Sequence, residues 1–335
     1  MFISKVNSYS VPVSYVDFKE LGIYEYTYIE NDIRGKNESS CINNNCYNHK
    51  INVAKDMISK AIEDVRYGRR EKINAIWLET SGCFGHIISL LNSEDPDLIY
   101  ILDKFVNMNY FGSIQGNEGE AAYEDILNTL NKDYIFIICG AIPTKDNGLY
   151  TTIATYKGEK ITAMKAVRDI SKKAKHIIAV GTCASFGGPT AANPNLSEAV
   201  SVSSFLKRSD VINIPGCPAN PVWIAGTLGY LTSTGIPKLD KEGRPVAYYS
   251  TLIHDICPRR SFFDKGVFAK YFGDKECMYS LGCKGPSTYA YCPVSRWNDS
   301  ENWPIGDNTT CIGCAAPGFP DFKEQFIRGV KYNHD

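Results

Sequence analysis

Thiol and imidazole side chains in the last third of the sequence are spaced as metal ligands are. His254 and Cys257 form an HxxC pair, and Cys311 and Cys314 form a CxxC pair. Thiolates spaced in this way ligate zinc or the iron of iron–sulfur clusters, and histidine is an occasional substitute for cysteine. Two ligand sets follow one another along the chain. The first set is His254, Cys257, Cys277 and Cys283, and the second is Cys292, Cys311 and Cys314.

The number of ligands bears on the choice between zinc and iron. Three cysteines and one histidine make an ordinary structural zinc site, so zinc remains an alternative for the first set. Three cysteines without a fourth ligand are awkward for zinc but suit a cluster with fewer irons. We therefore expect iron–sulfur clusters, with structural zinc as the alternative.

Apolar runs earlier in the chain predict the elements that position a further group of cysteines. Each run has the length of a strand and ends beside glycine and cysteine, and helical stretches over 121–130 and 164–173 lie between the runs. This alternation predicts a parallel sheet covered on both faces, in which sites form at the carboxyl ends of the strands. Cysteines from different strands are thus expected to converge. The runs are 73–78, 134–138, 176–180 and 211–214, and the cysteines beside their ends are Cys83, Cys139, Cys183 and Cys217.

Length and composition limit the class of protein. The 335 residues allow more than one domain, and a hydrophobic fraction of 44% is enough for a buried core. A net charge of −1 argues against nucleic-acid binding, and no apolar run is long enough to span a membrane. Residues 1–20 do not have the pattern of a secretory signal, and Arg69-Arg70 is internal and followed by Glu71-Lys72, so we expect a cytoplasmic protein whose thiols stay free to bind metals.

Several blocks of sequence resemble the small subunit of nickel–iron ([NiFe]) hydrogenases. They follow one another in the family's order across about residues 71–322, and several motifs in order are far more specific than one CxxC. The blocks are WLETSGC (77–83), GAIP (140–143), GTCASFGG (181–188), IPGCP (214–218), LGCKGP (281–286), YCPVSRWN (291–298) and CIGCAAPGF (311–319).

The resemblance implies an α/β protein with three parts. Residues 1–70 would be an N-terminal extension, 71–240 a flavodoxin-like parallel-sheet domain with a proximal [4Fe–4S] cluster, and 241–335 a small loop-rich cluster domain. The last part would hold a medial [3Fe–4S] cluster on the three-cysteine set, because Pro304 stands where relatives with a fourth cysteine have it. It would hold a distal [4Fe–4S] cluster on the set that contains His254.

The function that the resemblance implies is electron transfer within a hydrogenase. The nickel–iron centre, where H2 is split or formed, belongs to a separate large subunit, which we expect as an obligate partner around the Cys83 and Cys183 loops. Electrons would pass through the three clusters to a redox acceptor at the distal end. The alternative is a hydrogenase-like electron-transfer subunit of another redox or H2-sensing complex.

The proximal site departs from the family pattern at two positions. His86 stands where the family has the second cysteine of a CxxC, and Cys139 stands where it commonly has glutamate before the Gly-Ala-Ile-Pro turn. Three hypotheses follow. His86 is the fourth ligand and raises the reduction potential, or Cys139 is the fourth ligand, or the cluster is incomplete. The sequence does not separate the first two.

Overall fold

The computed structural model describes residues 63–64, 66–67, 69, 71–93, 97–104, 106–298 and 301–321. All of them belong to the second of two compact units into which the chain divides, Asn48–Asp335. The predicted N-terminal extension, 1–70, lies almost wholly outside the described residues.

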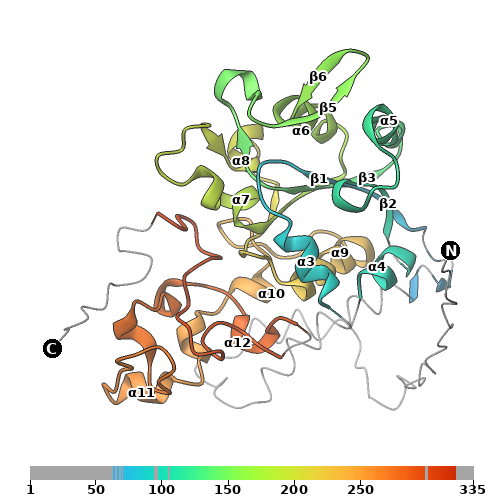
Figure 1. Cartoon of the computed structure of the whole chain (residues 1–335). Coiled ribbons are helices and arrows are strands. Elements are labelled where there is room, and N and C mark those ends of the chain that lie inside the picture. The colour runs from blue at the N-terminus through green and yellow to red at the C-terminus, as the bar shows by residue number, and fades with distance from the viewer. Residues whose placement is uncertain are drawn as a thin grey trace, which may run out of the picture. The chain divides into compact units, whose positions relative to one another are not determined.

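A five-stranded parallel sheet is the central element of the described structure (Figure 1). Its strand order is β2-β1-β3-β7-β9, in which the first strand lies next to one edge and the later strands follow in sequence on its other side. This is the strand order of flavodoxin-like folds, as expected. The strands are β1 (Ile73–Glu79), β2 (Val106–Phe111), β3 (Tyr134–Cys139), β7 (His176–Val180) and β9 (Ile212–Ile214).

The sequence predicts β1, β3, β7 and β9 because strands that are buried on both faces have nearly continuous apolar runs. All six residues of β3, for example, are buried. The sequence does not predict β2, which has asparagine at 107 and 109. This strand lies at the edge of the sheet and is partly exposed, so its sequence is less apolar than those of the central strands.

Helices cover both faces of the sheet. Figure 1 shows α5 (Gly119–Thr129) and α6 (Ala163–Ser171) on one side, and α3 (Gly85–Leu91) and α9 (Pro221–Ser233) on the other. Alternate residues of the central strands pack with α5 and α6 in one hydrophobic core. On the opposite side, nine of the thirteen residues of α9 are buried, which accounts for its almost entirely apolar sequence.

Shorter elements complete this part of the chain. The additional helices are α4 (Leu98–Lys104), α7 (Gly181–Phe186) and α8 (Val202–Leu206), with 3-10 turns η3 (Gly112–Ile114), η4 (Lys145–Gly148) and η5 (Gly188–Ala191). Two antiparallel strand pairs lie outside the main sheet: β4 (Ile142–Pro143) with β8 (Ala199–Val200), and β5 (Thr152–Tyr156) with β6 (Glu159–Thr162).

Regular structure becomes sparse after α9. The described helical elements there contain no more than five residues each, as the loop-rich sequence predicts. They are α10 (Val246–Tyr249), η6 (Ile253–Ile256), α11 (Arg260–Asp264), η7 (Met278–Leu281), η8 (Gly285–Ser287) and α12 (Cys292–Ser295). Among the residues that the structure describes, no helix combines the length and the apolar character that spanning a membrane requires.

Candidate functional site

Three of the predicted proximal ligands follow the carboxyl ends of three strands. Cys83 follows β1, Cys183 lies in the first turn of α7 after β7, and Cys217 follows β9. We call them the proximal group. Partial burial, and after it the neighbouring thiols of Cys314, Cys183 and Cys83, raise the pKa of the Cys217 thiol to about 12. These thiols are therefore close enough to repel one another as thiolates, and the predicted convergence at this edge of the sheet is observed. Cys83 and Cys217 are exposed, so the proximal group opens to the surface.

Two glycines allow the loop that carries Cys83 to lie directly on the turn after β3. A Cβ atom on Gly82 would lie 2.9 Å from the Cα of Gly140, and one on Gly140 would lie 2.7 Å from the carbonyl carbon of Ser81. The two segments exchange backbone hydrogen bonds between Ser81 and Ala141, of 3.1 and 2.8 Å. Larger residues at either glycine would separate Cys83 from the end of β3.

Hydrogen-bond donors point at two of the proximal sulfurs. The backbone N–H of Gly85 donates to Cys83 Sγ over 3.4 Å, and the Thr190 hydroxyl, whose single proton has two acceptors, lies 3.3 Å from Cys183 Sγ and 3.0 Å from the Ser81 carbonyl oxygen. Such donors stabilise negative charge on sulfur and raise the reduction potential of an iron–sulfur cluster. Thr190 is not part of a ligand motif, so its contact with Cys183 could not be predicted from the sequence.

The two alternative proximal ligands, His86 and Cys139, are both buried beside this group. His86 lies in the first turn of α3, and its Nδ1 accepts the Ala219 N–H over 3.1 Å. Burial lowers the pKa of His86 to about 4. Cys139 is the last residue of β3, and its pKa is raised by burial and then by Glu79, Cys83 and Cys183.

The second ligand set, which we call the medial group, consists of Cys292, Cys311 and Cys314. Burial raises the pKa of Cys292, and the thiols of Cys314 and Cys311 raise it further. The pKa of Cys311 is raised by burial and then by Cys283, a member of the first ligand set. The medial group therefore lies between the other two. Cys314 interacts electrostatically with Cys217 on one side, and on the other side Cys311 interacts with Cys283 and its carbonyl accepts the Lys284 N–H over 2.7 Å.

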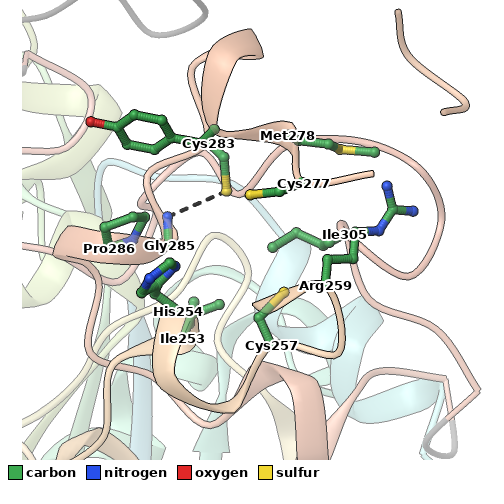
Figure 2. A pocket seen from close by; sticks show the side chains of 11 residues that line it. Ile253, His254, Cys257, Arg259, Cys277, Met278, Cys283, Gly285, Pro286 and Ile305 are labelled. Atoms are coloured by element: carbon green, nitrogen blue, oxygen red, sulfur yellow. Dashed lines mark hydrogen bonds between the residues drawn. The ribbon is translucent and has the colours of Figure 1, made fainter. Parts of the chain in front are cut away.

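The first ligand set, which we call the distal group, lines one cavity. Figure 2 shows His254, Cys257, Cys277 and Cys283 around a common space. The remaining walls include Ile253, Met278, Pro286 and Ile305, which are apolar. Gly285 N–H donates to Cys283 Sγ over 3.5 Å, and the His254 ring meets Phe263 edge to face at 4.4 Å.

The distal histidine is suited to act as a neutral ligand. Partial burial lowers the pKa of His254, and Arg260 lowers it further against the opposing effects of Asp255 and Asp264. A neutral imidazole has a nitrogen lone pair available for a metal. Four sulfur and nitrogen donors around an apolar cavity thus have the chemistry of an iron–sulfur ligand set.

A site for a single metal ion, such as structural zinc, has less support than a cluster site. Within the described ranges, no three His, Cys, Asp or Glu side chains lie close enough together to hold one metal ion. The described residues therefore form no ready site for a single ion, as structural zinc would require.

Polar side chains outside the ligand sets hold the proximal and medial loops together. The Thr182 hydroxyl accepts the Gly216 N–H over 2.9 Å and donates to the carbonyl of Cys314. One side chain thus ties the segment before Cys217 to a medial ligand. Thr182 lies inside the GTCASFGG block, but its partners are distant in sequence and could not be predicted.

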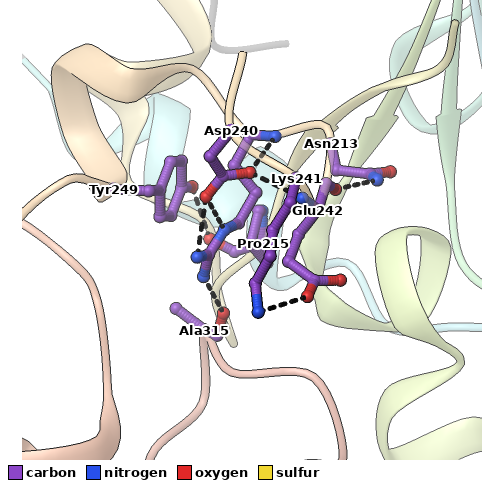
Figure 3. Close-up of polar contacts among 8 residues, drawn as sticks. Asn213, Pro215, Asp240, Lys241, Glu242, Tyr249 and Ala315 are labelled. Atoms are coloured by element: carbon purple, nitrogen blue, oxygen red, sulfur yellow. Dashed lines mark hydrogen bonds and ion pairs between the residues drawn. The ribbon is translucent and has the colours of Figure 1, made fainter.

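A buried arginine makes a second connection (Figure 3). Arg244 forms an ion pair with Asp240 at 2.8 Å, donates to the Ala315 carbonyl over 3.4 Å, and lies 5.3 Å from the centre of the Tyr249 ring. The Tyr249 hydroxyl donates to the Pro215 carbonyl over 2.7 Å. Arg244 and Tyr249 therefore link the residues beside Cys314 to the residues before Cys217, and neither was predicted from the sequence.

Two known families match consecutive parts of the chain. Residues 83–231 match the family described as NADH ubiquinone oxidoreductase, 20 Kd subunit, and residues 249–327 match the C-terminal family of the NiFe/NiFeSe hydrogenase small subunit. Among curated proteins, the periplasmic [NiFeSe] hydrogenase small subunit of Desulfomicrobium baculatum is 36% identical over 76% of this chain and 87% of the relative. The periplasmic [NiFe] hydrogenase small subunit 1 of Nitratidesulfovibrio vulgaris is 39% identical over 76% of this chain and 81% of the relative.

Solved structures agree with the sequence relatives. The [NiFeSe] hydrogenase of Desulfovibrio vulgaris Hildenborough is similar with a TM-score of 0.74 and 35% identity, over 78% of this chain and 99% of that one. The [NiFeSe] hydrogenase of Desulfomicrobium baculatum gives a TM-score of 0.72 at 35% identity, over 75% of this chain and 97% of that one.

The prediction of a cytoplasmic location is wrong. The two curated relatives named above are periplasmic hydrogenase small subunits, and so is that of Solidesulfovibrio fructosivorans. The prediction rested on the lack of a recognisable export pattern, which does not by itself identify the compartment.

Proposed function

The chain belongs to the family of [NiFe] hydrogenase small subunits, the electron-transfer partners of a large subunit, and on that premise we propose that three iron–sulfur clusters carry its electrons. The proximal cluster is [4Fe–4S] on Cys83, Cys183 and Cys217, with His86 or Cys139 as the fourth ligand. The medial cluster is [3Fe–4S] on the medial group, and the distal cluster is [4Fe–4S] on the distal group. When bound, such clusters supply one-electron transfer between the large subunit and an acceptor.

The observation that carries this proposal is the serial arrangement of the three groups. Thr182 joins Gly216, beside Cys217, to the carbonyl of Cys314. The N–H of Lys284, beside Cys283, donates to the Cys311 carbonyl over 2.7 Å, so each group adjoins the next. A relay requires such a series, whereas separate structural metal sites do not. The boundary at residue 240 between a sheet domain and a cluster domain is part of the same proposal.

The protein groups around the ligands have two roles in this proposal. Buried apolar residues exclude water from the medial and distal groups, and N–H and O–H donors to sulfur adjust each potential. We place the electron acceptor at the distal end, beside the half-buried His254.

Metal analysis of the native complex tests the proposal. The complex is purified without oxygen, and iron, nickel and acid-labile sulfide are measured. About 11 irons per small subunit beyond those of the large subunit are expected for two four-iron clusters and one three-iron cluster. About 7 irons would mean an empty proximal site. That result would favour the alternative that the chain is an electron-transfer subunit of another redox or H2-sensing complex.

We propose that the surface beside the proximal group is covered by the large subunit. Phe84, Ile88 and Leu91, in and just before α3, are 62%, 56% and 59% exposed, respectively. Apolar side chains next to an open redox group are typical of an obligate interface.

Replacing Ile88 and Leu91 together by serine is expected to weaken the heterodimer by about 100-fold, because each apolar side chain contributes about 1.5 kcal/mol or more when buried. Dilution experiments with the purified heterodimer measure the dissociation constant. The matched control is Leu149→Ser with Ile236→Ser, two positions that are 58% and 59% exposed and lie outside α3. Equal weakening by both pairs would contradict the proposed interface.

The distal histidine gives a redox prediction. His254→Cys is expected to lower the distal reduction potential by on the order of 100 mV, since a thiolate donates more negative charge than an imidazole. A redox titration followed by electron paramagnetic resonance measures the shift. Phe263→Leu removes the ring against His254 but keeps the ligand, and serves as the control. An unchanged potential in His254→Cys would argue against ligation by His254.

A further inference from the structure

We propose that Cys139 supplies the fourth ligand of the proximal cluster and that His86 is not a ligand. This inference rests on the proposed function and decides between the alternatives that the sequence left open. It is carried by the position of Cys139 in the sheet and by the hydrogen bond that His86 makes.

The position of Cys139 follows from the alternation of side chains along β3. Tyr134, Phe136 and Ile138 belong to the core shared with α5 and α6. Successive side chains of a strand point to opposite faces, so Cys139 faces the other side of the sheet, which α3 and α9 cover. That side is where the chain after β1 carries Cys83 into α3.

The neighbouring strands place Cys139 between two proximal ligands. Its Cα pairs with Glu79 at the end of β1 and with Val180 at the end of β7. Cys83 follows the first of these strands and Cys183 follows the second. The Cys139 side chain is 4% exposed, and its thiol interacts electrostatically with the thiols of both Cys83 and Cys183.

The hydrogen bond of His86 is incompatible with ligation. Its Nδ1 lies 3.1 Å from the Ala219 nitrogen and accepts that N–H, so Nδ1 carries no proton and its lone pair is engaged. A neutral imidazole has one proton, which must then be on Nε2. A histidine that binds metal through one nitrogen presents the other as an N–H donor, and a backbone N–H cannot accept that hydrogen bond.

The backbone also restrains the opposite edge of the His86 ring. A Cβ atom added to Gly181 would lie 2.1 Å from both Cε1 and Nε2 of His86. The ring therefore occupies a slot between the Gly181 backbone and the Ala219 N–H. Turning either nitrogen toward a cluster would require one of these segments to move.

Thiolate ligation changes the expected redox properties. A cluster on Cys83, Cys139, Cys183 and Cys217 has four thiolates, so it lacks the rise in potential that an imidazole ligand produces. The first hypothesis from the sequence, a proximal site of three cysteines and His86, predicts a higher potential. The two assignments therefore differ in the nitrogen signature of the ligands and in the reduction potential.

Iron analysis of two variants of the anaerobically purified heterodimer provides the first test. Cys139→Ala is expected to lose between about one and about four irons, since a cubane without one ligand becomes a three-iron cluster or does not assemble. His86→Asn, in which the amide oxygen can still accept the Ala219 N–H, is expected to retain all of the iron. Full iron in Cys139→Ala together with loss in His86→Asn would overturn the proposal.

Nitrogen hyperfine spectroscopy decides the question without relying on either variant. The heterodimer is labelled with ¹⁵N-histidine and carries His254→Cys, which removes the proposed distal nitrogen ligand. No histidine nitrogen coupling is expected on the signals of the reduced iron–sulfur clusters, and any remaining coupling would overturn the assignment of Cys139. Failure of the proposed function would be distinct, because the unaltered complex would then lack proximal iron.

Discussion

A heterodimer with Cys183→Ala is expected to lose H2-driven reduction of an added dye by at least about 100-fold. Residues that only orient a metal ligand typically contribute 10- to 100-fold to metal affinity or activity, and Cys183 is proposed as a direct ligand. The loss should be specific to electron transfer, because the large subunit does the hydrogen chemistry. Exchange of hydrogen isotopes between H2 and water is therefore expected to continue.

Two variants of neighbouring residues control this experiment. Thr190→Val removes the hydroxyl that lies 3.3 Å from Cys183 Sγ but keeps the thiol, and its effect on dye reduction should be much smaller. Ser185→Ala lies on the same short helix and loses a hydrogen bond to the Ala179 carbonyl, away from the ligands. Dye reduction that persists unchanged in Cys183→Ala would remove this residue from the relay.

Arg244→Met is expected to destabilise the subunit by about 3 kcal/mol, because it leaves the largely buried carboxylate of Asp240 without its cationic partner. The variant also loses the hydrogen bond to Ala315 and the contact with the Tyr249 ring. The thermal midpoint of the heterodimer, scanned at one fixed rate, measures the loss.

Two further variants separate the effect of the unpaired Asp240 charge on stability from the effect of the contacts that Arg244 loses. Adding Asp240→Leu to Arg244→Met removes the unpaired carboxylate and is expected to recover part of the stability. Arg260→Met breaks the exposed pairs with Asp255 and Asp264 and is expected to change stability by less than about 1 kcal/mol. A similar loss of stability in Arg260→Met and Arg244→Met would contradict the explanation that burial of the Arg244–Asp240 pair causes the large effect.

The sequence predicts the sheet well where hydrophobic burial determines it. The runs of β1, β3 and β7 are apolar because both faces are covered, and their carboxyl ends lead to the proximal cysteines. The edge strand β2 lacks this pattern, since β1 is its one partner among the described strands and Asn107 and Asn109 are tolerated there. The ligand spacings similarly predicted which cysteines line the distal cavity.

The role of His86 could not be predicted from its place in the motif. That role depends on which ring nitrogen faces the Ala219 N–H, a contact across 133 residues of sequence. Thr182 and Arg244 were missed for the same reason, since each binds a backbone carbonyl more than 70 residues away. Motifs record ligand types, whereas hydrogen bonds to distant backbone groups depend on the whole fold.

The contact between Thr182 and Cys314 has a consequence for how the holoprotein matures. In the described residues after α9, regular structure is sparse, since no helical element there has more than five residues. That region is joined to the segments around β7 and β9 by the contacts of Thr182 with Cys314 and of Tyr249 with Pro215, and we expect its metal ligands to add order when clusters are bound. We therefore expect cluster insertion and docking of the C-terminal segment to be coupled, because a chain cut near residue 240 would separate Thr182 and Cys217 from Cys314.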